Sequence, residues 1–283
     1  MTKLTYEQSV KWLRSQVQHS DLVNLCYLDE DNILAAKRFS KSEEFSEVEK
    51  LLKLCNFTKK FKILDLGCGN GIASYAFASN GHDVTAVDPD LSYDIGLGAT
   101  SKLSSILSCG SISTLQGFAE ALPLDDSTFD IVYARQSLHH FSDLQKGLLE
   151  CSRVLKKGGL FLATREHVVN DNKQLNEFLD GHILHQWHGG ENAYSVDAYK
   201  LAINKAGFTI LKCLAPFDSV INHFPASVAD IRSWLTNWLD HKIGKKFTPI
   251  FLKFTLIETI YRWRLSQTCN SAGRLYSFLC IKK

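Results

Sequence analysis

Three glycines at alternate positions, Gly67, Gly69 and Gly71, follow a short apolar run and precede a helix-forming run at 72–80. A strand that enters a glycine turn and continues into a helix surrounds a ligand with backbone N–H groups, and glycine lets that ligand approach the main chain. Asp65 lies two residues before the first glycine. A carboxylate there would repel a phosphate but could hold an ammonium group. The stretch therefore predicts a site for a cationic or zwitterionic ligand.

The spacing of these glycines argues against a dinucleotide. The dinucleotide fingerprint G-x-G-x-x-G needs its third small residue at position 72, where this chain has Ile72. The third glycine comes one residue early, and Asp65 is unsuited to a pyrophosphate. A nicotinamide-dependent oxidoreductase is therefore an alternative with two features against it.

A second acidic residue follows the next apolar run. Val84, Ala86 and Val87 predict a buried strand that ends in Asp88, 17 residues past Gly71. In a strand–turn–helix–strand unit this places Asp88 beside the glycine turn, where a carboxylate can accept hydrogen bonds from a ribose diol. The two motifs together predict a nucleoside site.

The run from Ala119 to Val132 contains A-E-A-L-P-L and F-D-I-V. With D-x-G-x-G-x-G at 65–71, it resembles the class I S-adenosylmethionine-dependent methyltransferases, in particular the branch (methyltransferase type 11) that includes the quinone-biosynthesis methylases. The resemblance covers 62–166 firmly and the last two strands weakly. It implies a Rossmann-like α/β fold, a mostly parallel seven-stranded sheet with an antiparallel last strand and helices on both faces.

The resemblance also implies S-adenosyl-L-methionine as cofactor. Asp65 would hold its ammonium group, Asp88 its ribose, and Phe118 with Ala119 would enclose its adenine. Phe118 departs from the family, which often has an acidic side chain there. The full set of cofactor-binding candidates is Asp65, Gly67, Cys68, Gly69, Asp88, Pro89, Phe118, Ala119 and Arg135.

Polar side chains follow two further predicted strands, where the family places the methyl group and the acceptor. His139 and His140 follow the strand at 131–134, and Arg165-Glu166-His167 follows the strand at 160–164. Residues leaving parallel strands line the ligand crevice of such sheets. His139 or His167 is therefore the expected base. The predicted acceptor-binding residues are His140, Arg165, Glu166, His185, Glu191, Tyr27 and Arg38.

Three histidines, His182, His185 and His188, could in principle hold zinc. Their spacing does not keep them on one helical face, and no H-E-x-x-H motif supports them. We expect no metal, and we interpret this segment as a polar acceptor-binding loop.

The remaining segments predict accessory structure. We divide the chain into a helical cap at 1–61 and a methyltransferase domain at 62–283, with accessory segments at 167–195 and 216–273. The last of these could be a lid, a dimer face or a membrane-surface helix. Because Lys253 and Glu258 interrupt its apolar run, we favour a lid packed on the core, and peripheral membrane contact through 228–265 is the alternative.

Composition sets further bounds. The chain has 283 residues, a net charge of +2 and 45% hydrophobic residues, which gives no reason to expect a nucleic-acid partner. Its eight cysteines form no C-x-x-C pair, and the first residues resemble no signal peptide. No run is apolar enough to span a membrane. These features predict a cytoplasmic protein with reduced thiols, and they leave the oligomeric state open.

The expected activity is methyl transfer to a small-molecule acceptor, most simply a hydroxyl of a sugar-like or secondary-metabolite substrate. The alternatives are C- or O-methylation of a lipid or quinone-type acceptor, an oxidoreductase, and a non-catalytic cofactor-binding protein. Whether oxygen, nitrogen or carbon is methylated stays open at this point.

Overall fold

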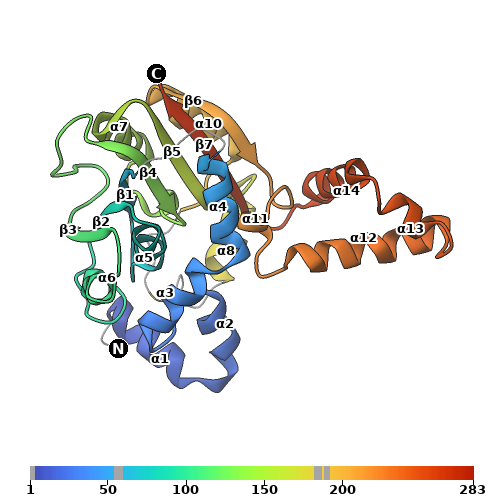
Figure 1. The fold of residues 1–283 in the computed structure, drawn as a ribbon, viewed down its shortest axis with the longest axis horizontal. Helices are drawn as coiled ribbons and strands as arrows, with labels where there is room; N and C mark the ends of the chain where they lie inside the picture. The colour runs from blue at the N-terminus through green and yellow to red at the C-terminus, as the bar shows by residue number, and fades with distance from the viewer. Residues whose placement is uncertain (1–3, 54–59, 182–186, 188–191) are drawn as a thin grey trace.

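The computed structural model describes residues 4–53, 60–181, 187 and 192–283. Its centre is a seven-stranded sheet in the order β3-β2-β1-β4-β5-β7-β6 (Figure 1). Strand β7 runs antiparallel to both of its neighbours, and the pairs among β1 to β5 are parallel. The predicted fold class is thus confirmed. The strands are β1 (Lys62–Leu66), β2 (Asp83–Asp88), β3 (Ser111–Gln116), β4 (Phe129–Arg135), β5 (Leu155–Val168), β6 (Phe208–Leu214) and β7 (Arg274–Lys282).

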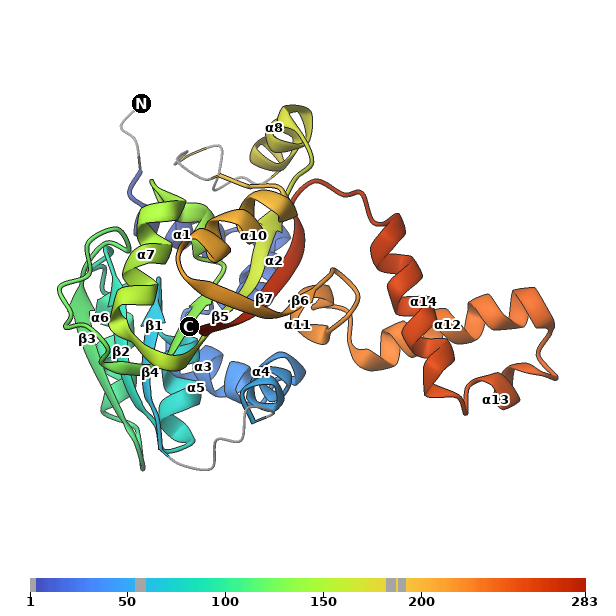
Figure 2. The same cartoon turned by 90° about the horizontal axis from the view of Figure 1, so that it is seen from above.

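The central strands are buried on both faces, as expected for a parallel sheet covered by helices. Leu64 and Val132 point to one face and pack in a core with α7 and α10, whereas Ile63 and Ile131 point to the other, with α3, α4 and α5. Figure 2 shows these two helical layers on opposite sides of the sheet. The helices of the body are α3 (Asn32–Ser40), α4 (Glu43–Lys53), α5 (Ile72–Ser79), α6 (Leu97–Ser104), α7 (Leu144–Val154), α8 (Asn172–Asp180) and α10 (Val196–Lys205).

The N-terminal segment is helical, as the sequence predicts. Helices α1 (Tyr6–Ser15) and α2 (Ser20–Leu25) precede α3 and α4, and Thr5 caps α1 through a capping box. The hydroxyl of Ser42 accepts from the N–H of Phe45 at 3.1 Å, next to the start of α4. Because α3 and α4 share a core with the sheet, the boundary at residue 61 stays a prediction.

Strand β5 differs from the expected strand at 160–164, because it continues to Val168 instead of ending before Arg165. Its pairing with β7 shifts register between Ala163 and Glu166, and Arg165 has a φ of +60°. A bulge of this kind re-aims side chains, here turning Glu166 into the protein interior, where it is fully buried. The prediction that Arg165, Glu166 and His167 emerge together at the rim is therefore wrong.

The long insertion before β7 is a helical projection and not a lid. Helices α12 (Val228–Ile243), α13 (Thr248–Phe251) and α14 (Thr255–Thr268) extend sideways from the body in both views (Figures 1 and 2). The short helix α11 (Val220–His223) joins them to the core. Our expectation of a lid packed on the core is thus not met. No helix in the described part of the chain is long and apolar enough to cross a membrane.

Candidate active site

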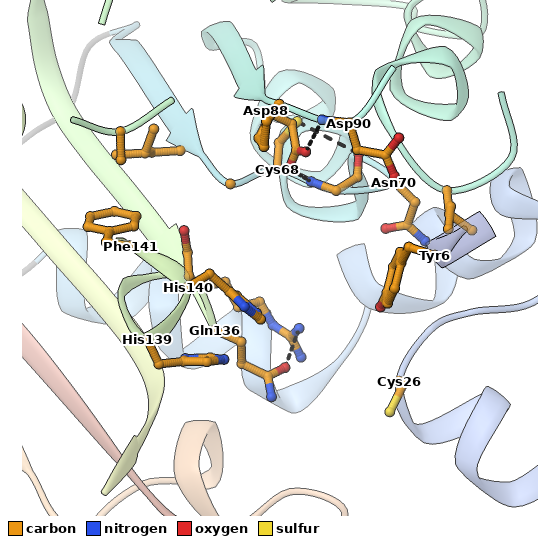
Figure 3. Close-up of a pocket in the computed structure, with 18 of the residues that line it drawn as sticks. Tyr6, Cys26, Cys68, Asn70, Asp88, Asp90, Gln136, His139, His140 and Phe141 are labelled. Carbon is orange, nitrogen blue, oxygen red and sulfur yellow. Dashed lines mark hydrogen bonds between the residues drawn. The ribbon is translucent and has the colours of Figure 1, made fainter. Parts of the chain in front are cut away.

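A cavity of about 1190 Å³ lies at the carboxyl ends of β1, β2 and β4. Figure 3 shows Asp88 and Cys68 on one side of it and His139 and His140 on another. The N-terminal helices close a further side, through Tyr6 and Cys26 among others. The cavity therefore joins the predicted nucleoside site to the predicted acceptor site.

The glycine turn forms as the sequence predicts. Gly67, Gly69 and Gly71 all have a positive φ, which L side chains rarely adopt. A Cβ at Gly67 would lie 2.1 Å from Oγ of Ser137, so the loop after β4 packs directly on the turn. A Cβ at Gly69 would meet only the carbonyl of Ile95, at 3.9 Å. The main chain at Gly69 is thus open to a ligand.

The carboxylate of Asp88 is held by the turn that it faces. Its Oδ2 accepts from the N–H of Gly69 at 2.8 Å, and its Oδ1 accepts from the N–H of Asp90 at 2.9 Å. Burial raises the pKa of Asp88, while these two hydrogen bonds act in the opposite direction. Each carboxylate oxygen has a further lone pair, so a fixed carboxylate can still accept from a ribose diol.

Asp65 lies below the turn and is 2% exposed. The hydroxyl of Ser74 donates to its Oδ2 at 2.6 Å. Burial raises the pKa of Asp65 to about 6, and the hydrogen bond from Ser74 counteracts part of this rise. A buried carboxylate with one short hydrogen bond is well placed to be stabilised by a cationic ligand.

The charges of the cavity wall test whether the residues suit the predicted cofactor. Among the described residues, six carboxylates line the cavity together with one guanidinium, that of Arg135, which is paired with Glu44 outside the lining. Such a wall repels pyrophosphate and attracts the sulfonium and ammonium groups of S-adenosylmethionine. The lining thus fits this cofactor. Its acidic residues are Glu7, Asp65, Asp88, Asp90, Glu120 and Glu177.

The predicted adenine contacts lie at the edge of this wall. Ala119 is buried, whereas the side chain of Phe118 is 66% exposed and lines the cavity. Glu120 accepts from the hydroxyl of Ser142 at 2.9 Å and from the N–H of Asp143 at 3.2 Å, so it fixes the start of α7. The arrangement leaves an exposed aromatic ring where the family often has an acid.

His139 is joined to a buried glutamate at the acceptor end. Its Nδ1 lies 2.9 Å from Oε2 of Glu166, and it is 2% exposed. Glu166 also accepts from the N–H groups of Ser137, Leu138 and His139. Burial raises the pKa of Glu166 to about 7, against the lowering effect of these backbone donors. Glu166 therefore orients His139 and the loop that carries it.

Two further histidine rings pack beside His139. The ring centroids of His139 and His140 are 4.2 Å apart, and those of His139 and His167 are 4.7 Å apart. Nδ1 of His167 lies 2.9 Å from the carbonyl oxygen of Gly273. Burial is the main cause that lowers the pKa of His167 to about 3, and the neighbouring His139 lowers it further. All three rings line the cavity, and His167 stays neutral near pH 7.

The structure places some predicted acceptor residues away from the cavity. Arg165 donates to the carbonyl of Ile221 at 2.8 Å and lies over the ring of Phe224. Tyr27 is buried, and the guanidinium of Arg38 lies above its ring. Arg38 also pairs with Asp29 at 2.7 Å. Arg165, Glu166, Tyr27 and Arg38 are outside the described lining of the cavity. Their predicted contact with an acceptor has no support from this geometry.

Arg135 lines the cavity and also forms an ion pair with the buried Glu44. Its guanidinium forms two hydrogen bonds with Glu44, at 2.7 and 3.1 Å, and donates to Gln136 at 3.0 Å.

Pro89, Cys68 and Gly67 lie in the lining as predicted. His185 and Glu191 fall outside the described residues, as do His182 and His188. Within the described ranges, no group of three or more His, Cys, Asp or Glu side chains could hold a metal ion.

Sequence reasoning missed several residues of the wall. Glu7 and Tyr6 reach the cavity from α1, and Oε1 of Glu7 accepts from the N–H of Asp94 at 3.0 Å. Gln136 lines it with a positive φ of 50°. Glu7 carried a weak signal as an acid in the first turn of a helix, and Gln136 directly follows a strand end. Neither signal specifies a contact 80 or more positions away in sequence.

Known proteins resemble the part of the chain that carries the glycine turn. Residues 64–163 match a family model described as a methyltransferase domain. The uncharacterized methyltransferase YcgJ of Bacillus subtilis is 31% identical over 155 residues, which cover 51% of this chain and 57% of YcgJ. A ubiquinone biosynthesis O-methyltransferase of Rhizobium johnstonii is 34% identical over 105 residues, 36% of this chain and 40% of that protein.

The fold is also that of a solved relative. The crystal structure of YcgJ has a TM-score of 0.54 and 21% sequence identity, over 84% of this chain and 99% of YcgJ. The sequence matches span about half the length of the two relatives, between 40% and 57%. Over residues 64–163, the chain is thus similar to methyltransferase domains.

Proposed function

We propose that the protein transfers a methyl group from S-adenosylmethionine to a hydroxyl of a small-molecule acceptor, with His139 as the base. The observation that carries this proposal is the contact between His139 and Glu166 at one end of an acidic cavity. A histidine oriented by a carboxylate is suited to take a proton, and a hydroxyl must lose one when it is methylated. A neutral amine nitrogen attacks through its lone pair and loses its proton only afterwards, so it has less need of such a pair.

The glycine turn and its two acids would bind the cofactor, whose contribution is an electrophilic methyl group on a sulfonium. The open main chain at Gly69 would face the methionine part, and Asp65 would hold the ammonium group. Asp88 would accept from the ribose hydroxyls, while Phe118 and Ala119 would enclose the adenine. These roles follow from the positive φ values, the burial and the hydrogen bonds of the turn.

His139 and His167 have different proposed roles, the first as the base and the second as part of the wall that contacts the acceptor. An ionised Glu166 would accept from Nδ1 of His139, so Nε2 is the atom through which this ring would take the proton. The carboxylate of Glu166 would then stabilise the imidazolium that forms. The pKa of His167, about 3, makes its ring a poor base near pH 7. We therefore assign His167 to the acceptor wall, together with His140.

A more specific proposal concerns the chemical class of the acceptor. Phe141, Phe178 and the rings of His140 and His167 give this end of the cavity flat, partly apolar walls. Planar rings stack on such walls, which favours a phenol- or quinol-type hydroxyl over a sugar hydroxyl. The name of the Rhizobium relative supports the same choice. Arg165, which would give the acceptor end a polar wall suited to a sugar, does not line the cavity.

Two measurements test the proposed function. Calorimetric titration should show that S-adenosylhomocysteine binds and that NAD does not. The protein should then release S-adenosylhomocysteine from S-adenosylmethionine in the presence of ortho-diphenols or quinols, and far more slowly with sugars. Binding of NAD alone would contradict the cofactor assignment. Turnover with sugars alone would contradict the acceptor class, and cofactor binding without turnover on lipid, quinol and sugar extracts would favour a non-catalytic protein.

A further inference from the structure

The projection formed by α12, α13 and α14 has no role in the cavity. Of the residues that line the cavity, none belongs to 216–271. Figures 1 and 2 show the three helices extending away from the sheet, with α13 and the end of α12 far from it. We call residues 242–256, around α13, the tip of the projection. Its surface therefore serves something other than cofactor binding.

The base of the projection is held by its own contacts. Ile231, Leu235 and Leu239 of α12 are buried. Glu258 pairs with Arg262 at 2.8 Å and lies 3.7 Å from Arg232, which links α14 to α12. These contacts position the two long helices without help from the tip.

The tip, in contrast, exposes large apolar side chains. Phe247, Ile250, Phe254 and Leu256 are between 51% and 66% exposed. The exposed apolar surface continues along α14, where Leu256, Ile260 and Trp263 recur at helical spacing and are each more than half exposed. A contiguous apolar surface of this kind marks an interaction site in a protein that is not destabilised.

The charge of the tip indicates which partner it fits. Lys242, Lys245, Lys246 and Lys253 lie within it, and no acidic residue occurs between Asp240 and Glu258. Two copies that met through their tips would bring eight lysines together, which is unfavourable. A surface of anionic lipid supplies both an apolar layer for the aromatic side chains and negative charge for the lysines.

We propose that the tip binds the surface of a membrane that contains anionic lipids. Phe247, Ile250, Phe254 and Leu256 enter the boundary between headgroups and acyl chains, and the four lysines contact lipid phosphates. The projection lies on the surface and does not span it. This attachment is independent of the acceptor and of the proposed base, because it uses residues outside the cavity.

Sedimentation of the full-length protein with vesicles tests this proposal. We expect binding to vesicles that contain phosphatidylglycerol, weak binding to pure phosphatidylcholine, and a loss of binding at high salt. Replacing both exposed rings, Phe247→Ser with Phe254→Ser, should reduce binding by at least about tenfold. Lys245→Glu with Lys246→Glu should also reduce it by about tenfold or more, because each lysine contributes about 1 kcal/mol near an anionic surface.

Matched controls lie on α10, where Leu201 and Lys205 are exposed. Leu201→Ser with Lys205→Glu should leave vesicle binding unchanged, and circular dichroism with titration of S-adenosylhomocysteine would establish that each variant folds. No binding of the wild type to phosphatidylglycerol vesicles, or equal loss in the α10 variant, would overturn the proposal. Light scattering that shows a dimer abolished by the two Phe substitutions, without vesicle binding, would instead assign the tip to self-association.

Discussion

Nδ1 of His139 lies 2.9 Å from Oε2 of Glu166, although the two residues are separated by 27 positions. The contact joins the end of β4 to the bulge of β5, and both side chains are nearly or fully buried. Glu166 holds the loop before His139 through its backbone N–H groups as well. One carboxyl group thus positions both the proposed base and the loop that carries it.

The base is tested by His139→Gln. We expect kcat to fall roughly 10²- to 10⁴-fold, because proton transfer by a positioned side chain contributes about this much. Titration with S-adenosylhomocysteine should show unchanged affinity, since His139 is on the acceptor side. His140→Gln is the comparison, because this ring also lines the cavity but is exposed, whereas His139 is buried. It should raise KM and spare kcat, and equal loss of kcat in both variants would refute the assignment.

A pH dependence follows from Asp65, whose pKa burial raises to about 6. A carboxylate attracts the ammonium group of the cofactor only when it is ionised. Binding of S-adenosylhomocysteine should therefore weaken as the pH falls through about 6, by up to about tenfold per pH unit. Calorimetry across this range measures the slope, and calorimetry in buffers of different ionisation enthalpy should detect proton release on binding. Asp65→Asn should bind more weakly at pH 7 and lose the slope. A wild-type affinity that stays constant from pH 7 to 5 would contradict this role.

The ribose contact is tested by Asp88→Ala. This change removes the acceptor for the partly buried N–H groups of Gly69 and Asp90, which costs about 1 kcal/mol for each hydrogen bond lost. We expect both a lower free energy of unfolding and a loss of S-adenosylhomocysteine binding of at least about tenfold. Asp94→Asn is the control, because Asp94 lies in the same loop region but pairs with Lys11 outside the cavity lining. If both variants bind equally well, Asp88 does not hold the cofactor.

The turn itself is tested by Gly67→Ala against Gly158→Ala. The φ angle is +70° at Gly67 and +74° at Gly158. A Cβ at Gly158 would meet no atom within 4 Å, whereas a Cβ at Gly67 would overlap Ser137. Gly158→Ala should lower the free energy of unfolding by about 1–2 kcal/mol, the cost of a left-handed residue. Gly67→Ala should cost more and also abolish cofactor binding. Chemical denaturation and calorimetry measure the two effects, and equal costs would show that the loop after β4 adapts.

The buried pair of Glu44 and Arg135 predicts a second pH effect. Burial acts to raise the pKa of Glu44, but Arg135 and Arg165 outweigh it, so the pKa lies below its usual value. The stability from this pair is therefore present above the ordinary pKa of a glutamate and is lost as the pH falls through the lower, folded value. Glu44→Gln should reduce the free energy of unfolding at pH 7 by about 3–5 kcal/mol, because it leaves buried guanidinium charge uncompensated.

The exposed pair of Glu47 and Lys50 provides the control for this change. Glu47→Gln should alter the free energy of unfolding by less than about 1 kcal/mol, because a surface ion pair contributes little. Urea denaturation at pH 7 and near pH 4 compares the two variants with the wild type. A Glu44→Gln variant as stable as Glu47→Gln would show that the buried charges have rearranged.

The sequence by itself determined the fold class and the glycine turn with its two neighbouring acids. Apolar runs that end in Asp65 and Asp88 specify neighbouring strand ends, and glycines at alternate positions specify the turn, because these are local patterns with a geometric consequence. The same reasoning predicted that His139 follows a strand end. Each of these inferences spans few residues of sequence.

The tertiary structure decided which acceptor-side residues meet. A bulge in β5 turned Glu166 inward to His139 and sent Arg165 away, although the three residues at 165–167 read alike in sequence. Tertiary contacts also committed Arg135 to Glu44, 91 positions earlier, and left the helices at 228–268 projecting instead of closing the cavity. Register shifts and packing between distant segments depend on the whole sheet, so no local pattern of residues encodes them.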